Sequence, residues 1–293
     1  MALYGWPIVY ALFVWWFSTV AILYLDGLPR RTFAWSFAAA TALAAASLYA
    51  VVKLGADTSI SGAYASFTGG LIIWGWLEMG FYTGFLAGPR KSAEEGTTGW
   101  RHFVHATETT LYHELASLLV ACLLIAFARH QPNQLGCWTF AVLWLMQVSA
   151  KLNVFLGVRN LNEEFLPDHL KFLSAYLTAK PMNLLFPVSV TVSTLAAALL
   201  VSWAIESTGF AAVSASFLAT IVVLAVLEHW LLVLPLPTAA LWSWGLKTHA
   251  APPAPLPDNV EPLWSADRAR HPLKTASPVL LTLEGGITMM PKR

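Results

Sequence analysis

The sequence predicts an all-α membrane protein, a polytopic bundle of about seven transmembrane helices. Of its 293 residues, 57% are hydrophobic and 11% are charged, whereas about a quarter of the residues of an average soluble protein carry a charge. Several windows contain about 20 predominantly apolar residues, the length that a helix needs to cross the hydrocarbon core of a bilayer. The net charge of +1 gives no indication of a nucleic-acid partner.

The apolar segments are separated by connectors rich in Gly, Pro, Asp and Ser, the residue types that form turns. The predicted spans are residues 3–25, 32–54, 63–87, 103–128, 136–158, 184–206 and 210–234. The first segment, "MALYGWPIVYALFVWW", lacks a basic region and a small-residue cleavage site, so we expect an uncleaved span rather than a signal peptide. Cys122 and Cys137 lie in apolar segments without metal-type spacing, which favours a packing role.

The distribution of Lys and Arg predicts the orientation of the bundle. Fourteen of these residues fall in the first, third and fifth connectors and in the C-terminal tail, and only Lys53 and Arg129 fall on the opposite side. Because positive residues are retained in the cytoplasm, the N-terminus is predicted outside and the C-terminus inside. Lys151 lies within the fifth span and belongs to neither side.

The connector after the fifth span is unusually polar and is predicted to form a cytoplasmic lid with an interfacial helix over residues 159–183. Pro167 and Asp168 suit the first turn of that helix. Residues 1–247 therefore form the predicted transmembrane domain. The Pro-rich residues 248–293, with "APPAPLP", form a predicted cytoplasmic tail.

Ionisable residues within the spans gather in the predicted cytoplasmic half of the bilayer. Such residues are costly in lipid and indicate function by default. They are Glu78 in the third span, His105, Glu108, His113 and Glu114 in the fourth, Lys151 in the fifth, and Glu228 and His229 in the seventh. The convergence of four helices predicts a polar cluster, over which the lid closes.

Three interpretations of this cluster remain open at the level of sequence. It could be a set of structural ion pairs between helices, a site for a divalent metal such as iron or zinc, or a pocket in which one His binds a tetrapyrrole pigment. The metal hypothesis names Glu78, His105, Glu108, His113, Glu164, Glu228 and His229 as ligands. The lid and docking residues would be Arg159, Asn160, Asn162, Glu163 and His169. The metal hypothesis requires Glu78, His105 and Glu108 to lie within a few ångströms of one another.

Several well-marked enzyme motifs are absent from the sequence. It contains no H-E-x-x-H, no G-x-S-x-G and no P-loop. It also lacks the repeated His boxes of membrane desaturases and the D-x-x-x-D pair of prenyltransferases. No internal repeat supports a transporter.

Three segments, "WLEMGFYTGFLAGPRK", "FVHATETTLYHELA" and "KLNVFLGVRNLNEEFLPDHLKFL", resemble the PuhE family of photosynthetic complex assembly proteins of phototrophic bacteria. The resemblance extends over essentially the whole chain. It implies a multi-pass protein of the bacterial inner (cytoplasmic or intracytoplasmic) membrane, encoded beside a gene for one of the polypeptides of the photosynthetic reaction centre. It also implies a role in bacteriochlorophyll supply or in assembly of the reaction centre and light-harvesting complexes. It brings no established catalytic residues.

Two functional hypotheses follow. The first is a non-enzymatic assembly factor that contacts lipid and either reaction-centre or light-harvesting subunits or pigment-synthesis proteins, with or without pigment contacts. The second is a metal-dependent, di-iron type membrane oxidoreductase of pigment or isoprenoid metabolism that uses the Glu/His cluster.

Overall fold

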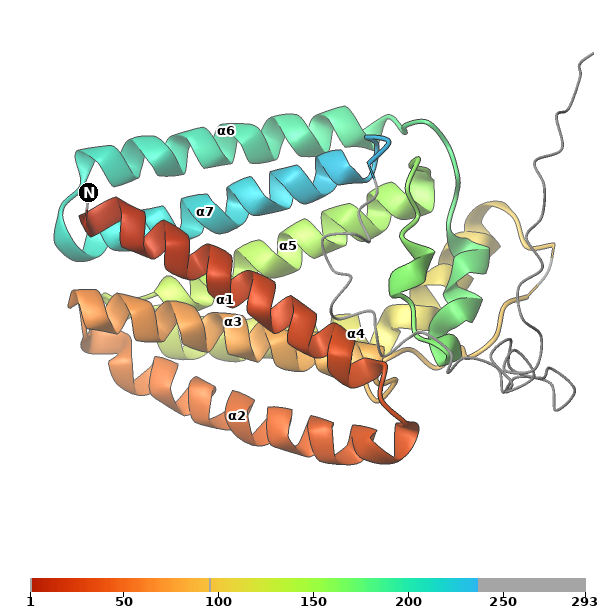
Figure 1. The fold of residues 1–293 in the computed structure, drawn as a ribbon, viewed down its shortest axis with the longest axis horizontal. Helices are drawn as coiled ribbons and strands as arrows, with labels where there is room; N and C mark the ends of the chain where they lie inside the picture. Colours follow the sequence, from red (N-terminus) through yellow and green to blue (C-terminus); the bar gives the residue numbers. More distant parts are fainter. Residues whose placement is uncertain (1, 95, 237–293) are drawn as a thin grey trace, which may run out of the picture. The chain divides into compact units, whose positions relative to one another are not determined.

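The computed structural model describes residues 2–94 and 96–236, which form a bundle of long helices (Figure 1). The long helices are α1 (Ala2–Asp26), α2 (Phe33–Lys53), α3 (Ile60–Tyr82), α4 (Gly99–Ala128), α5 (Leu135–Leu156), α6 (Leu185–Glu206) and α7 (Gly209–Leu231). Short 3₁₀ helices are η1 (Arg30–Thr32), η2 (Leu54–Ala56), η3 (Glu163–Phe165) and η4 (Asp168–Tyr176). The prediction of an all-α polytopic bundle is confirmed. The predicted tail at 248–293 lies outside the described residues.

Successive helices alternate in direction, so their connectors meet at two ends of the bundle. At one end, called the lid end, the backbone N–H of Asn160 donates to the carbonyl of Leu232 at 2.9 Å. At the opposite end the Asn133 side chain donates to the carbonyls of Leu54, Asp57 and Gly62. The lid end carries the connectors in which the sequence concentrates Lys and Arg.

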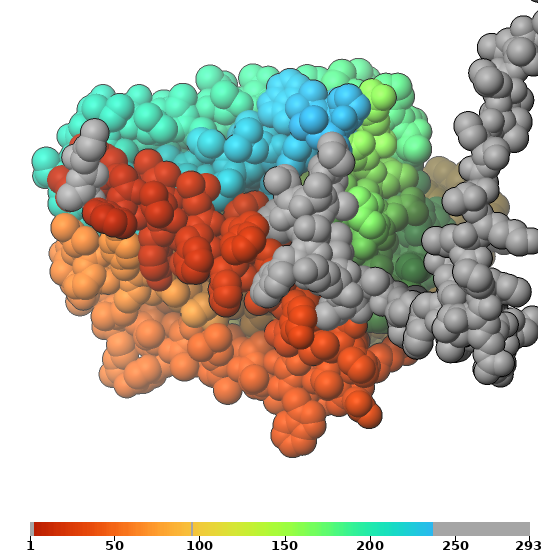
Figure 2. All heavy atoms as spheres, viewed as in Figure 1, coloured from red at the N-terminus to blue at the C-terminus, as the bar shows by residue number. Residues whose placement is uncertain are grey.

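Helix α3 lies at the centre of the bundle and packs against α1, α2, α4, α5 and α7. Its small residues permit this close packing, since a side chain at Gly70 would collide with the backbone of Gly136 on α5. Phe67 of α3 stacks on Phe217 of α7, with ring centroids 4.2 Å apart and both side chains fully buried. On one face α1, in red, lies between α2, in orange, and α7, in blue (Figure 2).

Six of the seven long helices in the described residues are long and apolar enough to cross a membrane. The exception is α3, whose 23 residues suffice in length. Its Gly, Ser and Thr residues lower its mean hydropathy. Such a composition is suited to a helix that faces other helices rather than lipid. The predicted third span, 63–87, is therefore shifted, since α3 begins at Ile60 and ends at Tyr82.

The connector between α5 and α6 folds back over the lid end. It begins at Gly157, whose φ of +124° suits glycine, and Val158 then forms an isolated bridge with Ala179. The predicted interfacial helix is a nine-residue 3₁₀ helix, η4, whereas 3₁₀ runs rarely exceed four residues. Leu170 and Leu173 of η4 are buried in a cluster that also contains Phe81.

Candidate functional site

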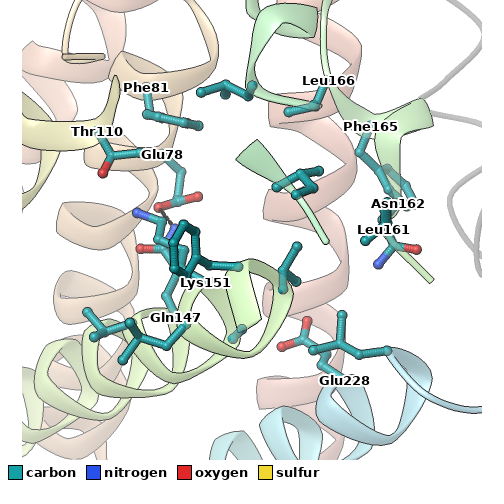
Figure 3. A pocket seen from close by; sticks show the side chains of 18 of the residues that line it. Glu78, Phe81, Thr110, Gln147, Lys151, Leu161, Asn162, Phe165, Leu166 and Glu228 are labelled. Carbon is teal, nitrogen blue, oxygen red and sulfur yellow. Dashed lines mark hydrogen bonds between the residues drawn. The ribbon is translucent and has the colours of Figure 1, made fainter. Parts of the chain in front are cut away.

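A cavity of about 850 Å³ lies inside the lid end of the bundle. Helices α1, α3, α4, α5 and α7 form its walls, and residues 161–177 of the connector contribute the rest of its lining. The lining is mainly apolar, with Trp15 and Trp16 from α1 and Phe165 and Leu166 from the connector. Among the described residues, four side chains with carboxylate or ammonium groups also border it. Figure 3 labels three of them, Glu78, Lys151 and Glu228, and the fourth is Glu114.

Lys151 stands at the centre of one polar group on this wall. Its Nζ lies 2.7 Å from Oε1 of Glu114 and 3.4 Å from Nδ1 of His113. The other imidazole nitrogen of His113, Nε2, lies 3.2 Å from Oε1 of Glu78. Gln147, one helical turn before Lys151, donates its side-chain N–H to the same Glu78 oxygen at 2.5 Å. We call Glu78, His113, Glu114, Gln147 and Lys151 the Lys151 network.

Aromatic side chains enclose this network within the bundle. His113 is fully buried, and the rings of Phe81 and Trp74 lie 5.4 and 6.0 Å from its imidazole. The ammonium group of Lys151 lies 5.4 Å from the centre of the Phe81 ring. Trp144 donates its indole N–H to Oε2 of Glu114 at 3.3 Å. The apolar surroundings lower the local dielectric and so strengthen the attraction between Lys151 and Glu114.

Glu228 enters the cavity from α7, separate from the Lys151 network. Its carboxylate points into the same space as that of Glu78, from the other side (Figure 3). Within residues 2–94 and 96–236, no side chain or backbone group forms a hydrogen bond with the Glu228 carboxylate. This acid is therefore available to a ligand.

The structure does not bring Glu78, His105 and Glu108 together as the metal hypothesis requires. The carboxylate of Glu108 accepts hydrogen bonds from Nε and NH2 of Arg90, both at 2.8 Å, and these bonds raise the pKa of Arg90. Nδ1 of His105 lies 3.3 Å from Glu94. Glu78 instead contacts His113, and across the described residues no three His, Cys, Asp or Glu side chains are grouped so as to hold a metal ion.

The reason for this separation is the length of α4, which begins at Gly99, four residues before the predicted start of the span. The backbone N–H of Gly88, beyond the end of α3, donates to the carbonyl of Thr109 at 2.6 Å. Any side chain at Gly88 would collide with the backbone of Glu108. The first ten residues of α4 therefore lie beside the connector, and His113 is the residue level with Glu78.

His229 belongs to a second polar group, which pins α5, α6 and α7 together. Its Nδ1 lies 2.8 Å from the carbonyl of Ala225, and its Nε2 lies 2.9 Å from Oγ of Ser149. Asn153 donates to Oγ of Ser189 at 3.0 Å, and Asn183 donates to the side chain of Asn153 at 3.1 Å. We call Ser149, Asn153, Asn183, Ser189 and His229 the Asn153 cluster. It does not line the cavity.

The predicted lid residues divide between two places. Asn160 holds the connector to the end of α7, since its side chain donates to the carbonyls of Leu231 at 2.7 Å and Leu234 at 2.5 Å. Asn162 has a left-handed backbone, with φ of 54°, and lines the cavity. Arg159 is exposed. Glu163, Glu164 and His169 border a smaller polar pocket of about 220 Å³ on the lid end.

Sequence reasoning missed two members of the site. Gln147 precedes Lys151 by four residues, so both lie on one face of α5, and this spacing could have identified it. Trp144 was not singled out, although it lies one further turn along on that face. Glu114 was noted among the polar residues but not proposed as a site residue.

Comparison with known proteins places the chain in a family. The model of the family described as "Protein of unknown function (DUF3623)" matches residues 1–253, and the chain belongs to this family. It is also similar to an uncharacterized 30.4 kDa protein in the puhA 5′ region of Rhodobacter capsulatus. The two are 37% identical over 245 residues, which cover 81% of this chain and 89% of that protein. No solved structure matches.

Proposed function

We propose that this chain is an integral membrane assembly factor of the bacterial photosynthetic apparatus, of the PuhE type. In this proposal the cavity holds a hydrophobic molecule, a tetrapyrrole pigment in the first instance, on its way into a photosynthetic complex. The observation that carries the proposal is the cavity of about 850 Å³. It has an apolar wall and a few convergent polar groups, as small-molecule sites of about 300–1,000 Å³ usually have.

The relative from Rhodobacter capsulatus supports the photosynthetic setting, because its name places it in the puhA 5′ region. By the resemblance, the partners would be reaction-centre or light-harvesting subunits, or proteins of pigment synthesis. The membrane would be the bacterial inner membrane, cytoplasmic or intracytoplasmic. The N-terminus would lie outside and the lid end in the cytoplasm, where residues 159–183 and the tail from 248 could meet partners.

No observation on the described residues favours the alternative, a metal-dependent oxidoreductase. Of its seven proposed ligands, Glu108 and His105 contact Arg90 and Glu94, and Glu78 and His113 belong to the Lys151 network. The other three lie elsewhere, with Glu164 at the smaller pocket, Glu228 in the cavity wall separate from the network and His229 in the Asn153 cluster. In the network, the ammonium group of Lys151 contacts both His113 and Glu114, whose Nδ1 and Oε1 atoms are themselves 3.5 Å apart. The ammonium group of Lys151 therefore already occupies the place at which these acidic and imidazole groups could hold a metal ion.

The proposal is tested by deleting the gene in a phototrophic host and restoring it with plasmid-borne variants. Absorption spectra of the membranes report the amounts of reaction centre and light-harvesting complexes. We expect deletion to lower them and Glu228→Gln to restore them only in part, while Glu206→Gln, an exposed acid at the other end of the bundle, restores them fully. Normal complex levels in the deletion strain would contradict the proposal.

Pigment extracts from the same strains separate an assembly factor from an enzyme. An assembly factor leaves every pigment intermediate at its normal proportion, whereas loss of an enzyme causes one defined precursor to accumulate. The absorption spectrum and metal content of the protein purified in mild detergent from that host provide the direct test of pigment binding. A colourless, metal-free preparation would remove the pigment from the proposal.

A further inference from the structure

The charges on the cavity wall do not balance among the described lining residues. Of the four carboxylate or ammonium side chains that border the cavity, three are acids, Glu78, Glu114 and Glu228, and one is a base, Lys151. Lys151 lies 2.7 Å from Glu114, so this pair is internally neutralised. The wall is left with two further acids that face each other across the cavity (Figure 3). They are Glu78, whose Oε1 lies 3.2 Å from Nε2 of His113, and Glu228.

The carboxylate oxygens of Glu78 and Glu228 are hydrogen-bond acceptors, and several of them have no donor within the described part of the chain. Oε1 of Glu78 receives the N–H of Gln147 and lies beside Nε2 of His113. No hydrogen bond within the described part of the chain involves Oε2 of Glu78 or either oxygen of Glu228. Glu228 is accessible through the cavity, and a carboxylate that borders apolar groups is costly unless a hydrogen-bond donor or a cation meets it. A bound molecule with hydrogen-bond donors would therefore complement these oxygens.

The positions of the acids set the way in which a ligand lies. Glu78 is one helical turn before the end of α3, and the ring of Phe81 and the side chain of Leu166 lie between that turn and the outer surface of the connector. The two acids, Glu78 and Glu228, therefore lie deeper in the bundle than the apolar lining that the connector contributes. A ligand whose polar group lies beside Glu78 and Glu228 keeps its apolar part against the apolar lining, which includes Phe165, Leu166, Leu173, Trp15 and Trp16.

We infer that the cavity selects its ligand by charge and accepts an apolar molecule whose polar group is neutral or cationic and donates hydrogen bonds. Anionic groups, such as diphosphate, carboxylate and sulfonate, are rejected by Glu78 and Glu228. Like charges placed together at a binding site cost several kcal/mol, and the low dielectric of an apolar cavity enlarges this effect. The inference rests on the proposed function of the cavity as a ligand site, and it specifies the class of ligand. It excludes isoprenoid diphosphates and free-acid pigments and retains apolar molecules that carry a hydroxyl, amide or ammonium donor.

The test uses three brominated long-chain probes with the same chain and different ends, an alcohol, a primary amine and a sulfonate. Bromine quenches Trp fluorescence at short range, and Trp15 and Trp16 line the cavity, so binding to the full-length protein in mild detergent is read as saturable quenching. The quenching that remains in the Trp15→Phe/Trp16→Phe variant comes from the other tryptophans and is subtracted. We expect the alcohol and the amine to bind at least about tenfold more tightly than the sulfonate, the ratio that corresponds to about 1.4 kcal/mol.

Glu228→Gln should reduce that preference at least about threefold, because it removes one of the two repelling charges. The matched control is Glu206→Gln, which removes an exposed acid far from the cavity and should leave the preference unchanged. If Glu228→Gln does not fold, the comparison of the three probes on the unmodified protein still decides the inference. Sulfonate binding as tight as alcohol binding would overturn charge selection while leaving the cavity as a ligand site. Absence of saturable quenching by every probe would overturn ligand binding itself, and the deletion experiment would then stand alone as the test of the assembly role.

Discussion

The Asn153 cluster and the Lys151 network occupy neighbouring turns of α5, and they differ in the charge of their members and in their access to the cavity. The Asn153 cluster contains only uncharged amides, hydroxyls and an imidazole, and Asn153 and His229 are almost fully buried. Its hydrogen bonds join α5 to α6 and α7. The Lys151 network contains charged groups, and its members Glu78, Glu114, Gln147 and Lys151 border the cavity.

The difference shows when a polar residue in a membrane helix indicates function. In the Asn153 cluster, the hydrogen bonds are made within the protein, so the polar groups serve helix association. In the cavity, Glu228 has no hydrogen bond from the described residues, and the charged side chains are held beside an open space. Sequence alone assigned His229 and Glu228 to the same hypothetical metal site because both lie in the predicted cytoplasmic half of the bilayer. Adjacent residues of a helix point about 100° apart, so Glu228 borders the cavity while His229 contacts Ser149. This separates a structural residue from a candidate ligand-binding residue.

The largest expected effect comes from breaking the ion pair of the Lys151 network. Lys151→Met leaves Glu114 without its cation in an apolar setting, and removal of one partner of a buried pair typically costs about 3–5 kcal/mol. Because both side chains are partly accessible from the cavity, we expect the lower end, about 3 kcal/mol in the free energy of unfolding. Denaturant titration in mixed micelles measures it. Lys151→Met combined with Glu114→Gln should recover most of the loss, and equal losses in the single and double variants would show that no ion pair stabilises the fold.

A second, smaller loss is expected in the Asn153 cluster. Asn153→Ala removes the donor to Ser189 and the partner of Asn183, and each buried polar group left unsatisfied costs about 1–3 kcal/mol. In membranes the cost per hydrogen bond averages closer to about 0.6 kcal/mol, so we expect about 2 kcal/mol in total. Probe binding to the folded variant should not change, because the cluster does not line the cavity. A variant that folds normally but loses probe binding would erase the distinction between the two groups.

Much of this fold could be predicted from the sequence because lipid imposes one strong rule, that a spanning segment be long, helical and apolar. The rule located six helices well. It located α3 less accurately, since a central helix satisfies packing instead, with Gly70 against Gly136. To predict that Glu78, His113 and Lys151 meet, one must know the relative positions of α3, α4 and α5 along the bundle axis. The sequence placed the start of α4 a few residues too late, and so His105 instead of His113 was paired with Glu78.

The third prediction concerns the attachment of the connector above the cavity. Asn160→Ala removes two hydrogen bonds to the carbonyls of Leu231 and Leu234, at a cost of about 1 kcal/mol. Because the backbone bond to Leu232 remains, we expect local opening rather than global unfolding. Hydrogen exchange should accelerate at residues 158–166, and bound probe should dissociate faster. Glu163→Ala, an exposed residue of the same connector, is the control. Unchanged exchange in Asn160→Ala would show that the connector is held by its apolar contacts alone.

The smallest expected effect is a dependence of stability on pH at His169, on the outer side of that connector. Burial is the main cause that lowers the pKa of His169 below its usual 6.5, and the positive charges of Arg30 and Lys91 lower it further, while a hydrogen bond with the Tyr82 backbone and the charge of Asp168 partly oppose them. As the pH falls through about 6.5, the unfolded chain therefore takes up a proton that the folded protein does not, and the free energy of unfolding decreases. The decrease ends once the pH is below the pKa of the folded state. His169→Gln should flatten this part of the stability curve, whereas His130→Gln, at the exposed opposite end, should preserve it. A curve that stays the same in both variants would show that the connector does not disfavour the charged form of His169, and the acid sensitivity would then have to come from within the bundle.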